Sequence, residues 1–538
     1  MTRLHVVLDT PAPNLANLAT VEPGTPDIPF AKSGQLLDAT RGAYRRWFGE
    51  KYDMGALEAV LATAAAERLG GDPCWLLVVS GSGAAKTETI MPLEGSGALV
   101  VSTITGEAAL LSGTSEKDRA PDATGGLLRK IGETGVLVVK DVTTIISMSR
   151  DSRAEVLAAL REIYDGRWNR EVGTEGGRTL SWHGKIVVIG AVTTAWDSAH
   201  SVIASMGDRF VLVRINSTQN RREAGLQALK NVSYEPAMRI ELAECVKALM
   251  ASVVRGTPVT LADEEMIALL DLADIVTLTR TAVEYDQQGN VISAHAPEMP
   301  TRFAKQLAQI VRGGIALGMT RGAALTLAVR CAGDSLPPLR LAVLRDLASN
   351  SPSPVSDIVK RLQMPRKTID RTLQALHLLG VLTAAEEKWG QSTRAVYAVS
   401  DGIDSEALAR LARNGDTPPP ENGKTPERLA RNGEGGPRAE APDTKLARNG
   451  DTPVHPDQMT VPGTPPAEAP PAAPRATGPR KKPTPDPKPK RRCQATGCRK
   501  NIPGTARSDA QYCSPACRFR QADKRKRAAK KTTPKETP

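Results

Sequence analysis

Lys86 and Thr87 end a short turn of small residues, and this turn carries the clearest chemical signal in the chain. It follows the unbroken apolar run 75–79, which is typical of a buried parallel strand. Such a turn points backbone N–H groups at phosphates, with the amino end of the next helix behind them. Lys86 would neutralise the β- and γ-phosphates, and the Thr87 hydroxyl would hold Mg²⁺. The pattern predicts a phosphate site made of Ser80, Gly81, Ser82, Gly83, Ala84, Ala85, Lys86 and Thr87.

The match to the usual phosphate-binding turn is incomplete. The usual pattern has glycine where Ser80 and Ala85 stand. An ordinary turn between a strand and a helix, without any ligand, therefore stays a second interpretation of this segment. The residues that follow in the chain decide between the two.

Further apolar runs predict the elements that must position this turn. Helix-like patterns such as 154–164 lie between the runs. Alternating strands and helices indicate an α/β fold with a parallel sheet, in which ligands bind at the carboxyl ends of the strands. We expect a five-stranded sheet built from 75–79, 99–101, 136–139, 186–192 and 210–215.

Polar residues stand at the ends of three of these predicted strands. Asp141 follows the third run and would hold Mg²⁺ through water, and Thr193 follows the fourth, where its hydroxyl would sense a γ-phosphate. Arg209 comes just before the fifth run and would reach a phosphate in a neighbouring subunit. Polar caps on strand ends are the alternative. Four groups in this order favour an ATPase site with Lys86, Asp141, Thr193 and Arg209 as its catalytic residues.

From about residue 71 to residue 333 the chain resembles the AAA+ ATPases, and most closely the minichromosome-maintenance helicase branch. That branch inserts a β-hairpin where segment 168–182 stands, with a glycine-rich tip at 174–178. The resemblance implies ATP and Mg²⁺ as cofactors, DNA as the partner, and a homo-oligomeric ring or arc. Because such hairpins touch DNA in the family, Arg170 and Arg178 inherit DNA contacts; a plain surface hairpin stays the alternative.

The same resemblance assigns two arginines. The family's arginine finger lies in a Ser-Arg-Phe motif, which segment 207–210 resembles, so Arg209 inherits that role. Segment 300–307 resembles the family's second sensor and would place Arg302 against the γ-phosphate. An arginine that forms a salt bridge on its own helix stays a serious alternative for Arg302.

One departure from the family concerns hydrolysis. The family follows its Mg²⁺ aspartate with a glutamate that polarises water, whereas Val142 follows Asp141 here. Aligning Lys140 with the metal position would make Asp141 the base, but a lysine cannot bind Mg²⁺. The base stays unassigned, and Glu88 has no role that the sequence can assign. The alternative functions are a nucleotide-gated DNA-binding regulator with little turnover and an ATP-dependent protein remodeller.

Segment 336–400 resembles the winged-helix domains of bacterial regulators, with helices at 339–347, 354–362 and 365–379 and short strands at 381–382 and 395–399. Arg366, Lys367 and Arg371 on the third helix would contact DNA; a protein contact is the alternative. We expect a loose and helical segment 1–70, the ATPase core 71–216, a helical lid 217–335 with a loop at 285–300, the winged helix, a disordered linker 401–492, and a zinc module with a basic tail 493–538.

The end of the chain is strongly basic. Residues 480–538 hold 19 Lys/Arg against 4 Asp/Glu, so their net charge of +15 exceeds the +12 of the whole chain. A tail of this kind is attracted to polyanions such as nucleic acid through counterion release, although a purely solubilising tail is the alternative. The basic excess therefore belongs to the tail rather than to the ATPase core.

Four cysteines cluster in this tail with a spacing that suits tetrahedral Zn²⁺. A segment this small cannot build a core, so the metal would supply its folding energy; a disulfide pair is the alternative, disfavoured in a cytosol. Residues 512–518 also resemble the closing half of small bacterial zinc modules. The predicted zinc ligands are Cys493, Cys498, Cys513 and Cys517.

The linker repeats one short unit, Leu-Ala-Arg-Asn-Gly followed by Asp or Glu, at 411–416, 429–434 and 446–451. Slippage duplication is the favoured explanation, and docking of a protein partner is the alternative. The chain has no apolar run long enough to span a bilayer, and its first residues lack the apolar centre of a secretion signal. We therefore expect a cytoplasmic protein with no membrane contact.

Overall fold

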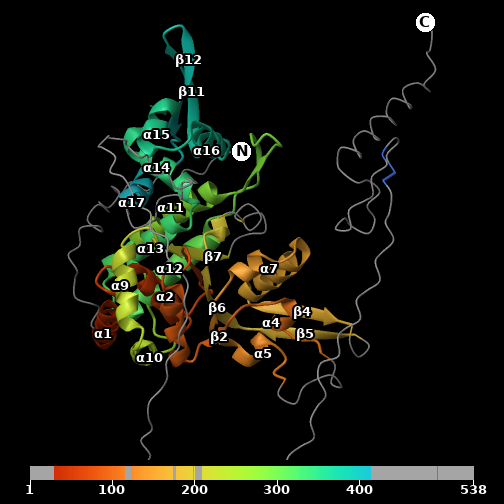
Figure 1. Ribbon diagram of the computed structural model, residues 1–538, viewed down its shortest axis with the longest axis vertical. Coiled ribbons are helices and arrows are strands. Elements are labelled where there is room, and N and C mark those ends of the chain that lie inside the picture. Colours follow the sequence, from red (N-terminus) through yellow and green to blue (C-terminus); the bar gives the residue numbers. More distant parts are fainter. Residues whose placement is uncertain are drawn as a thin grey trace, which may run out of the picture. The chain divides into compact units, whose positions relative to one another are not determined.

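The computed structural model describes residues 30–114, 123–173, 177–197, 199, 209–413, 493–494 and 498. The chain divides into two compact units, 1–431 and 432–538, and all described helices and strands lie in the first (Figure 1). The first two helices, α1 (Ala31–Phe48) and α2 (Met54–Ala66), precede the first strand. No helix in the described part of the chain is long and apolar enough to cross a membrane.

A five-stranded parallel sheet forms the centre of this unit and confirms the predicted α/β class. Its strand order is β2-β3-β6-β1-β7, and every neighbouring pair is parallel. Strand β1, which lies between β6 and β7, is buried along its whole length, as its unbroken apolar run predicts. The strands are β1 (Trp75–Val79), β2 (Leu99–Val101), β3 (Thr134–Val139), β6 (Lys185–Val192) and β7 (Phe210–Arg214).

The sheet separates two hydrophobic cores because alternate side chains of a strand point to opposite faces. Leu76 and Val78 of β1 pack with α1, α2 and the later helices. Trp75, Leu77 and Val79 pack in the other core, with α7 (Arg150–Tyr164). Figure 1 shows α7 on one side of the sheet and α2 on the other.

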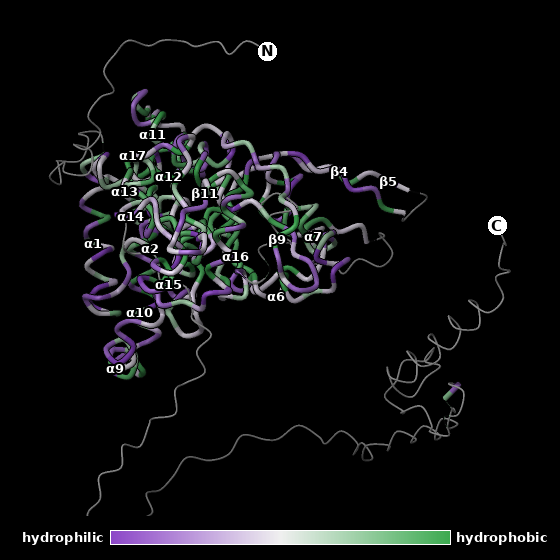
Figure 2. The backbone as a smooth tube through the Cα atoms, turned by 90° about the horizontal axis from the view of Figure 1, so that it is seen from above, coloured by the Kyte–Doolittle hydropathy of each residue, from purple (hydrophilic) through white to green (hydrophobic). Residues whose placement is uncertain are grey.

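The hairpin expected at 168–182 is present. It consists of β4 (Arg167–Val172) and β5 (Arg178–His183), and the cross-strand pair Trp168 and Trp182 is buried in the core beside α7. Both views show the hairpin projecting from the body of the unit (Figures 1 and 2). The short elements around it are α3 (Lys86–Ile90), η3 (Met91–Ser96), α4 (Glu107–Leu110), α5 (Leu127–Ile131) and α6 (Thr143–Ile146).

Helices follow the sheet, as expected for 217–335, but the loop predicted at 285–300 is partly wrong. A second hairpin, β8 (Val283–Tyr285) and β9 (Val291–Ala294), occupies it. Its turn is closed by Asp286 Oδ1, which accepts hydrogen bonds from the backbone N–H groups of Gln288 and Asn290. The helices are α9 (Arg221–Asn231), α10 (Glu235–Ser252), α11 (Asp263–Arg280), α12 (Thr301–Ala316) and α13 (Arg321–Asp334).

The next part of the chain combines three helices with an antiparallel sheet of order β10-β12-β11. Its strands β11 (Leu382–Trp389) and β12 (Ser392–Val399) are longer than the sequence predicted, since their exposed residues show little apolar alternation. The remaining strand and helices are β10 (Ser353–Pro354), α14 (Pro338–Asn350), α15 (Val355–Leu362) and α16 (Arg366–Leu378).

The start of the predicted disordered linker is helical, which corrects that prediction. Helix α17 (Ser405–Arg413) buries Ala407, Leu408 and Leu411. These residues lie on one helical face, so they bury apolar surface that the average composition of 401–492 conceals. The later repeat copies lie outside the described residues.

Candidate functional site

The turn 80–87 follows β1, an interior strand of the sheet. The Ser80 N–H donates to the Val192 carbonyl at 3.2 Å, so the turn begins where β1 and β6 end together. Gly83 has φ 79° and Ala85 has φ 55°, both in the left-handed region. Ala85 adopts this region without being glycine, at the position where the usual phosphate-binding turn has one. Helix α3 starts directly after it, at Lys86.

The Lys86 ammonium lies inside this turn. Its Nζ donates hydrogen bonds to the Ser80 carbonyl at 3.0 Å and the Gly81 carbonyl at 2.6 Å. Burial lowers the pKa of Lys86, and the charge of Asp141 partly opposes that shift. The lysine is therefore held at the carbonyls of its own turn. Its ammonium also interacts electrostatically with Asp141, which follows the end of β3.

Asp141 and Thr193 meet at the same edge of the sheet. Asp141 Oδ1 accepts the Thr143 N–H at 2.9 Å. Thr143 Oγ1 lies 3.4 Å from Thr193 Oγ1 and accepts the Thr193 N–H at 3.2 Å. Because β3, β6 and β1 are adjacent and parallel, their carboxyl ends bring Lys86, Asp141 and Thr193 to one edge. Thr87 and Asp141 are both exposed there.

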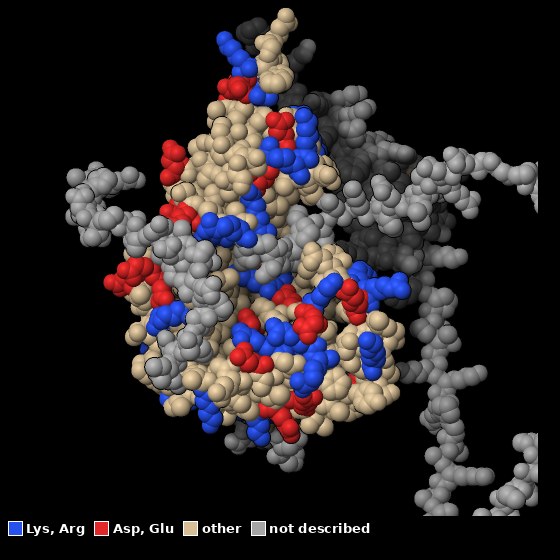
Figure 3. Space-filling view, turned by 90° about the vertical axis from the view of Figure 1, so that its left-hand side faces the viewer, with Lys and Arg blue, Asp and Glu red and all other residues tan. Residues whose placement is uncertain are grey.

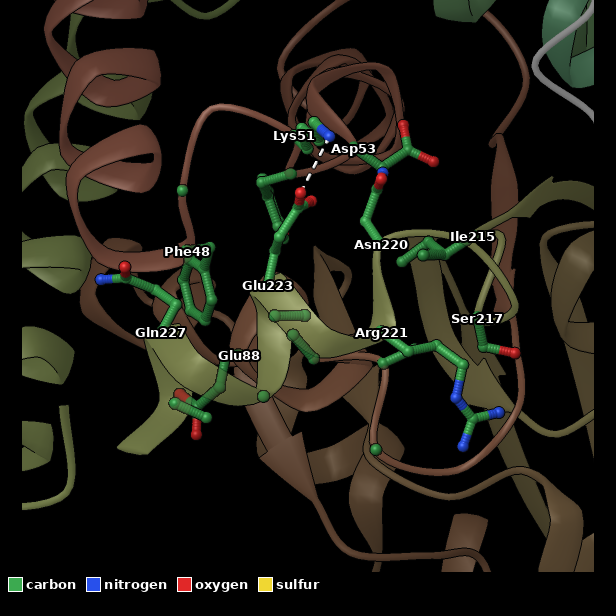
Figure 4. Close-up of a pocket in the computed structure, with 18 of the residues that line it drawn as sticks. Phe48, Lys51, Asp53, Glu88, Ile215, Ser217, Asn220, Arg221, Glu223 and Gln227 are labelled. Carbon is green, nitrogen blue, oxygen red and sulfur yellow. Dashed lines mark hydrogen bonds and ion pairs between the residues drawn. The ribbon is translucent and has the colours of Figure 1, made fainter. Parts of the chain in front are cut away.

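A cavity of about 1250 Å³ adjoins the phosphate turn. Segments 47–55, 81–85 and 215–231 line most of it (Figure 4). The sequence interpretation included only the turn. Asp53, Asn220 and Arg330 also line the cavity and were missed, because each belongs to an element whose own pattern carries no ligand signal.

Buried ion pairs support one wall of this cavity. Arg330 of α13 donates from Nη1 and Nη2 to the two carboxylate oxygens of Asp53, both at 2.6 Å. Arg330 Nη2 also donates to the Arg214 carbonyl at 3.0 Å. Arg214 in turn pairs with Asp197, and its backbone N–H donates to Asp334 at 2.8 Å. The network joins the cavity to the segment that follows Thr193.

Glu88 lines the cavity, but its side chain is engaged by a helix. Its carboxylate accepts hydrogen bonds from Arg239 of α10, the shortest at 2.9 Å. Its backbone carbonyl accepts from the Tyr44 hydroxyl at 3.3 Å. Since Val142 follows Asp141, the residues described at this edge offer no second carboxylate in the position of the family's base.

Arg209 and Arg302 lie at the opposite edge. Trp75 pairs with Phe210 at the amino ends of β1 and β7, so the backbone of Arg209 lies level with the residue before Trp75. Ser80 is about six residues further along β1, which corresponds to roughly 20 Å. Arg209 Nη2 lies 3.6 Å from Asp165, and its carbonyl accepts from Gln306 at 2.6 Å. Burial and then the charge of Arg302 lower the pKa of Arg209. The two arginines are neighbours, remote from Lys86 of their own chain.

The two hairpin arginines predicted to touch DNA have intramolecular partners. Arg170 donates to Glu107 at 2.7 Å and to the Leu111 carbonyl at 2.8 Å. Arg178 donates to the Thr114 carbonyl at 3.1 Å. Both side chains therefore fasten the hairpin to segment 107–114.

The cations of α16 differ in their surroundings. Arg366 and Lys367 are exposed at the start of the helix, and Arg366 lies 3.7 Å from Asp370. Arg371 donates to the Gln288 carbonyl of the β8–β9 turn at 2.5 Å. Figure 3 shows Lys and Arg mixed with Asp and Glu on the face it presents, rather than gathered in a patch of one sign.

The predicted zinc site lies largely outside the described residues. Cys493 and Cys498 are described, whereas Cys513 and Cys517 are not. Within the described ranges, no group of three or more His, Cys, Asp or Glu residues is arranged to hold a metal ion. The zinc ligands therefore stay a prediction from the cysteine spacing.

No family model matches this chain, and no curated protein matches it either. Among solved structures the chain is similar to "The A form apo structure of NrS-1 C terminal region-CTR", with 9% sequence identity and a TM-score of 0.22. The match covers 73% of this chain and 79% of that chain. A TM-score this low carries no argument about function, so function must be argued from the site itself.

Proposed function

We propose that this protein is an ATPase that binds Mg-ATP at the carboxyl edge of its parallel sheet and acts on DNA. The observation that carries the proposal is the meeting of Lys86, Asp141 and Thr193 at one sheet edge, beside a cavity large enough for a nucleotide. An ordinary strand-to-helix turn would not require an ammonium, a carboxylate and a hydroxyl together.

The residues fit the groups of Mg-ATP. The N–H groups of the turn would hold the phosphates. Lys86 would exchange its own turn carbonyls for phosphate oxygens, which are stronger acceptors for an ammonium. The Thr87 hydroxyl and, through water, Asp141 would hold Mg²⁺, which neutralises phosphate charge when bound. Thr193, fixed by Thr143, would contact the γ-phosphate.

The position of Arg209 favours an oligomer. An arginine at the amino edge of the sheet is too far from its own phosphate turn to contact the same nucleotide. A neighbouring protomer would bring it to that site as an arginine finger. Since Arg302 lies beside Arg209, both would be supplied together across the interface.

The remaining parts suit nucleic-acid binding. Segment 336–400, with three helices and a long antiparallel hairpin, supports a winged helix whose third helix presents Arg366 and Lys367. The basic tail with its zinc module would add a salt-dependent contact with the phosphate backbone. A helicase or translocase in replication or DNA processing is the activity that we propose.

The test is the ATPase rate of the full chain with and without single- and double-stranded DNA. We expect stimulation by DNA, and loss of activity in Lys86→Ala and in Arg209→Ala. Mixing the two inactive variants should restore part of the rate, since some interfaces then combine an intact Lys86 with an intact Arg209. A mixture as inactive as its components would refute the shared site, and a rate unchanged by DNA would favour a protein remodeller.

A second candidate is a nucleotide-gated DNA-binding regulator with little turnover. Two observations favour it: Val142 stands where the family has its glutamate, and Arg239 holds the carboxylate of Glu88. This function predicts tight binding of ATP, altered DNA affinity on binding, and a negligible hydrolysis rate under every DNA condition. The same assay therefore separates the two candidates.

A further inference from the structure

The cavity beside the phosphate turn has an aromatic wall. Trp47, Phe48 and Tyr52 line it, although aromatic residues make up only 3% of the chain. The ring of Phe48 stacks on Tyr44 at 5.7 Å and on Tyr52 at 4.9 Å. The ring centroids of Tyr44 and Tyr52 are 5.5 Å apart. If the two rings covered opposite faces of Phe48, their centroids would be separated by nearly the sum of their distances to Phe48, which is about twice as far. These two rings therefore leave one face of Phe48 for the cavity that it lines.

Helix α9 holds this wall in place. Asn231 Nδ2 donates to the Trp47 carbonyl at 2.6 Å, and Gln227 Nε2 donates to the Arg46 carbonyl at 3.3 Å. Both carbonyls belong to the last turn of α1, which has no intrahelical donors for them. The aromatic residues at the end of α1 are thus fixed by side chains from the other side of the cavity.

The facing wall is polar and approaches the phosphate turn closely. A Cβ on Gly81 would lie 2.6 Å from Ser217 Oγ, so the loop that follows β7 packs directly against the turn. Asn220 ends this loop with φ 53° and makes no capping hydrogen bond to α9. Figure 4 shows Phe48 and Asn220 on different elements around the same space. Lys51 and Glu223, 3.1 Å apart, join the two walls.

We propose that this part of the cavity binds the purine base of the nucleotide, with Phe48 as its stacking platform and Asn220 reading its edge. The inference rests on the proposed function, because the phosphates must lie on the turn 80–87. Every base offers a face that an aromatic ring can stack on, and a purine offers the larger face. A carboxamide supplies one donor and one acceptor, which match the N6 and N7 edge of adenine. The site therefore prefers ATP over CTP and over a bare triphosphate.

The test measures the dissociation constants of the full chain for Mg²⁺ complexes of ATP, CTP and tripolyphosphate by calorimetry. Phe48→Leu removes the ring but keeps an apolar side chain, and it should weaken ATP binding by about 5- to 150-fold. Its affinity for tripolyphosphate should stay within about twofold of wild type. Phe48→Tyr should restore ATP binding. Trp389→Leu is the matched control, because Trp389 is exposed outside the cavity and its loss should change nothing.

A second variant keeps the test decisive if Phe48→Leu folds poorly. Asn220→Gly preserves the left-handed backbone while removing the amide. When the Mg²⁺ complex of GTP is titrated as a further ligand, this variant should show a reduced preference for ATP over GTP. Equal weakening of all three ligands by Phe48→Leu, or no weakening of ATP, would overturn the base site. Wild-type protein that binds tripolyphosphate as tightly as ATP would also overturn it while leaving the proposed function intact. Wild-type protein that binds none of the three ligands would instead refute the proposed function.

Discussion

Removing the Asp53 carboxylate should destabilise the protein far more than removing a surface carboxylate. Asp53 pairs bidentately with Arg330, whose side chain is only 5% exposed. It also caps α2 by accepting the Ala56 N–H at 3.0 Å. In the intact protein burial lowers the pKa of Arg330, but the hydrogen bonds to Asp53 and the charge of Asp334 outweigh burial and raise it. Without Asp53, the guanidinium is left in a buried position with only Asp334 as a carboxylate partner.

The structure sets the size of this effect. Breaking a buried ion pair costs about 3–5 kcal/mol. The lower end applies here, since Asp334 remains 3.4 Å from Arg330 Nε and the Asp53 side chain is 21% exposed to water. Loss of the cap adds about 1 kcal/mol. We therefore expect about 4 kcal/mol for Asp53→Ala and about 3 kcal/mol for Asp53→Asn, which keeps the cap.

Urea unfolding followed by circular dichroism measures these differences. Asp38→Ala is the matched control, because Asp38 forms an exposed pair with Arg41 and its loss should cost at most about 1 kcal/mol. The double variant Asp53→Ala with Arg330→Met should be more stable than Asp53→Ala alone, since it no longer buries an unpaired charge. A cost below about 1 kcal/mol for Asp53→Asn, or strictly additive losses in the double variant, would refute the reasoning.

Four further outcomes are expected. Ala85→Gly should stabilise the protein by about 0.5–1 kcal/mol in urea unfolding, because relief of the left-handed strain exceeds the entropy cost of glycine; destabilisation would contradict this. The affinity for ATP, measured by calorimetry, should fall as the pH rises through the pKa of Lys86, because deprotonation removes its charge. Burial lowers this pKa, so the fall should begin at a lower pH than it would for an exposed lysine. The affinity of Lys86→Arg should not vary with pH over that range, because arginine stays protonated. Gly289→Asn tolerates the positive φ of Gly289 and places its Cβ against the Arg371 guanidinium, so the freed guanidinium should steepen the salt dependence of duplex binding in fluorescence anisotropy by about 0.9; an unchanged slope would exclude Arg371 from the contact. Metal analysis should find about one Zn²⁺ per chain, lost on chelation and in Cys517→Ser; metal-free protein would refute the zinc module.

Much of the central architecture follows from the sequence, because its signals are local. Five apolar runs are enough to specify the five strands of the parallel sheet, and the small-residue turn before Lys86 is recognisable without any neighbour. The sequence patterns did not predict elements whose burial depends on contacts with distant parts of the chain. The β8–β9 hairpin has exposed residues and only short strands, so it lacks a clear apolar pattern. Helix α17 buries two leucines, Leu408 and Leu411, which the polar average composition of the surrounding segment conceals.

The sequence by itself determined the five strands of the central sheet, the order of the polar groups along the chain, and the charge of the tail. Only the tertiary structure decided which of these groups share an edge of the sheet. It brings Asp53 to Arg330 across 277 residues, and it sets Arg302 beside Arg209 at the edge away from Lys86. The physical reason is that strand and turn patterns depend on neighbours in the chain, whereas ion pairs and cavities depend on how distant segments pack.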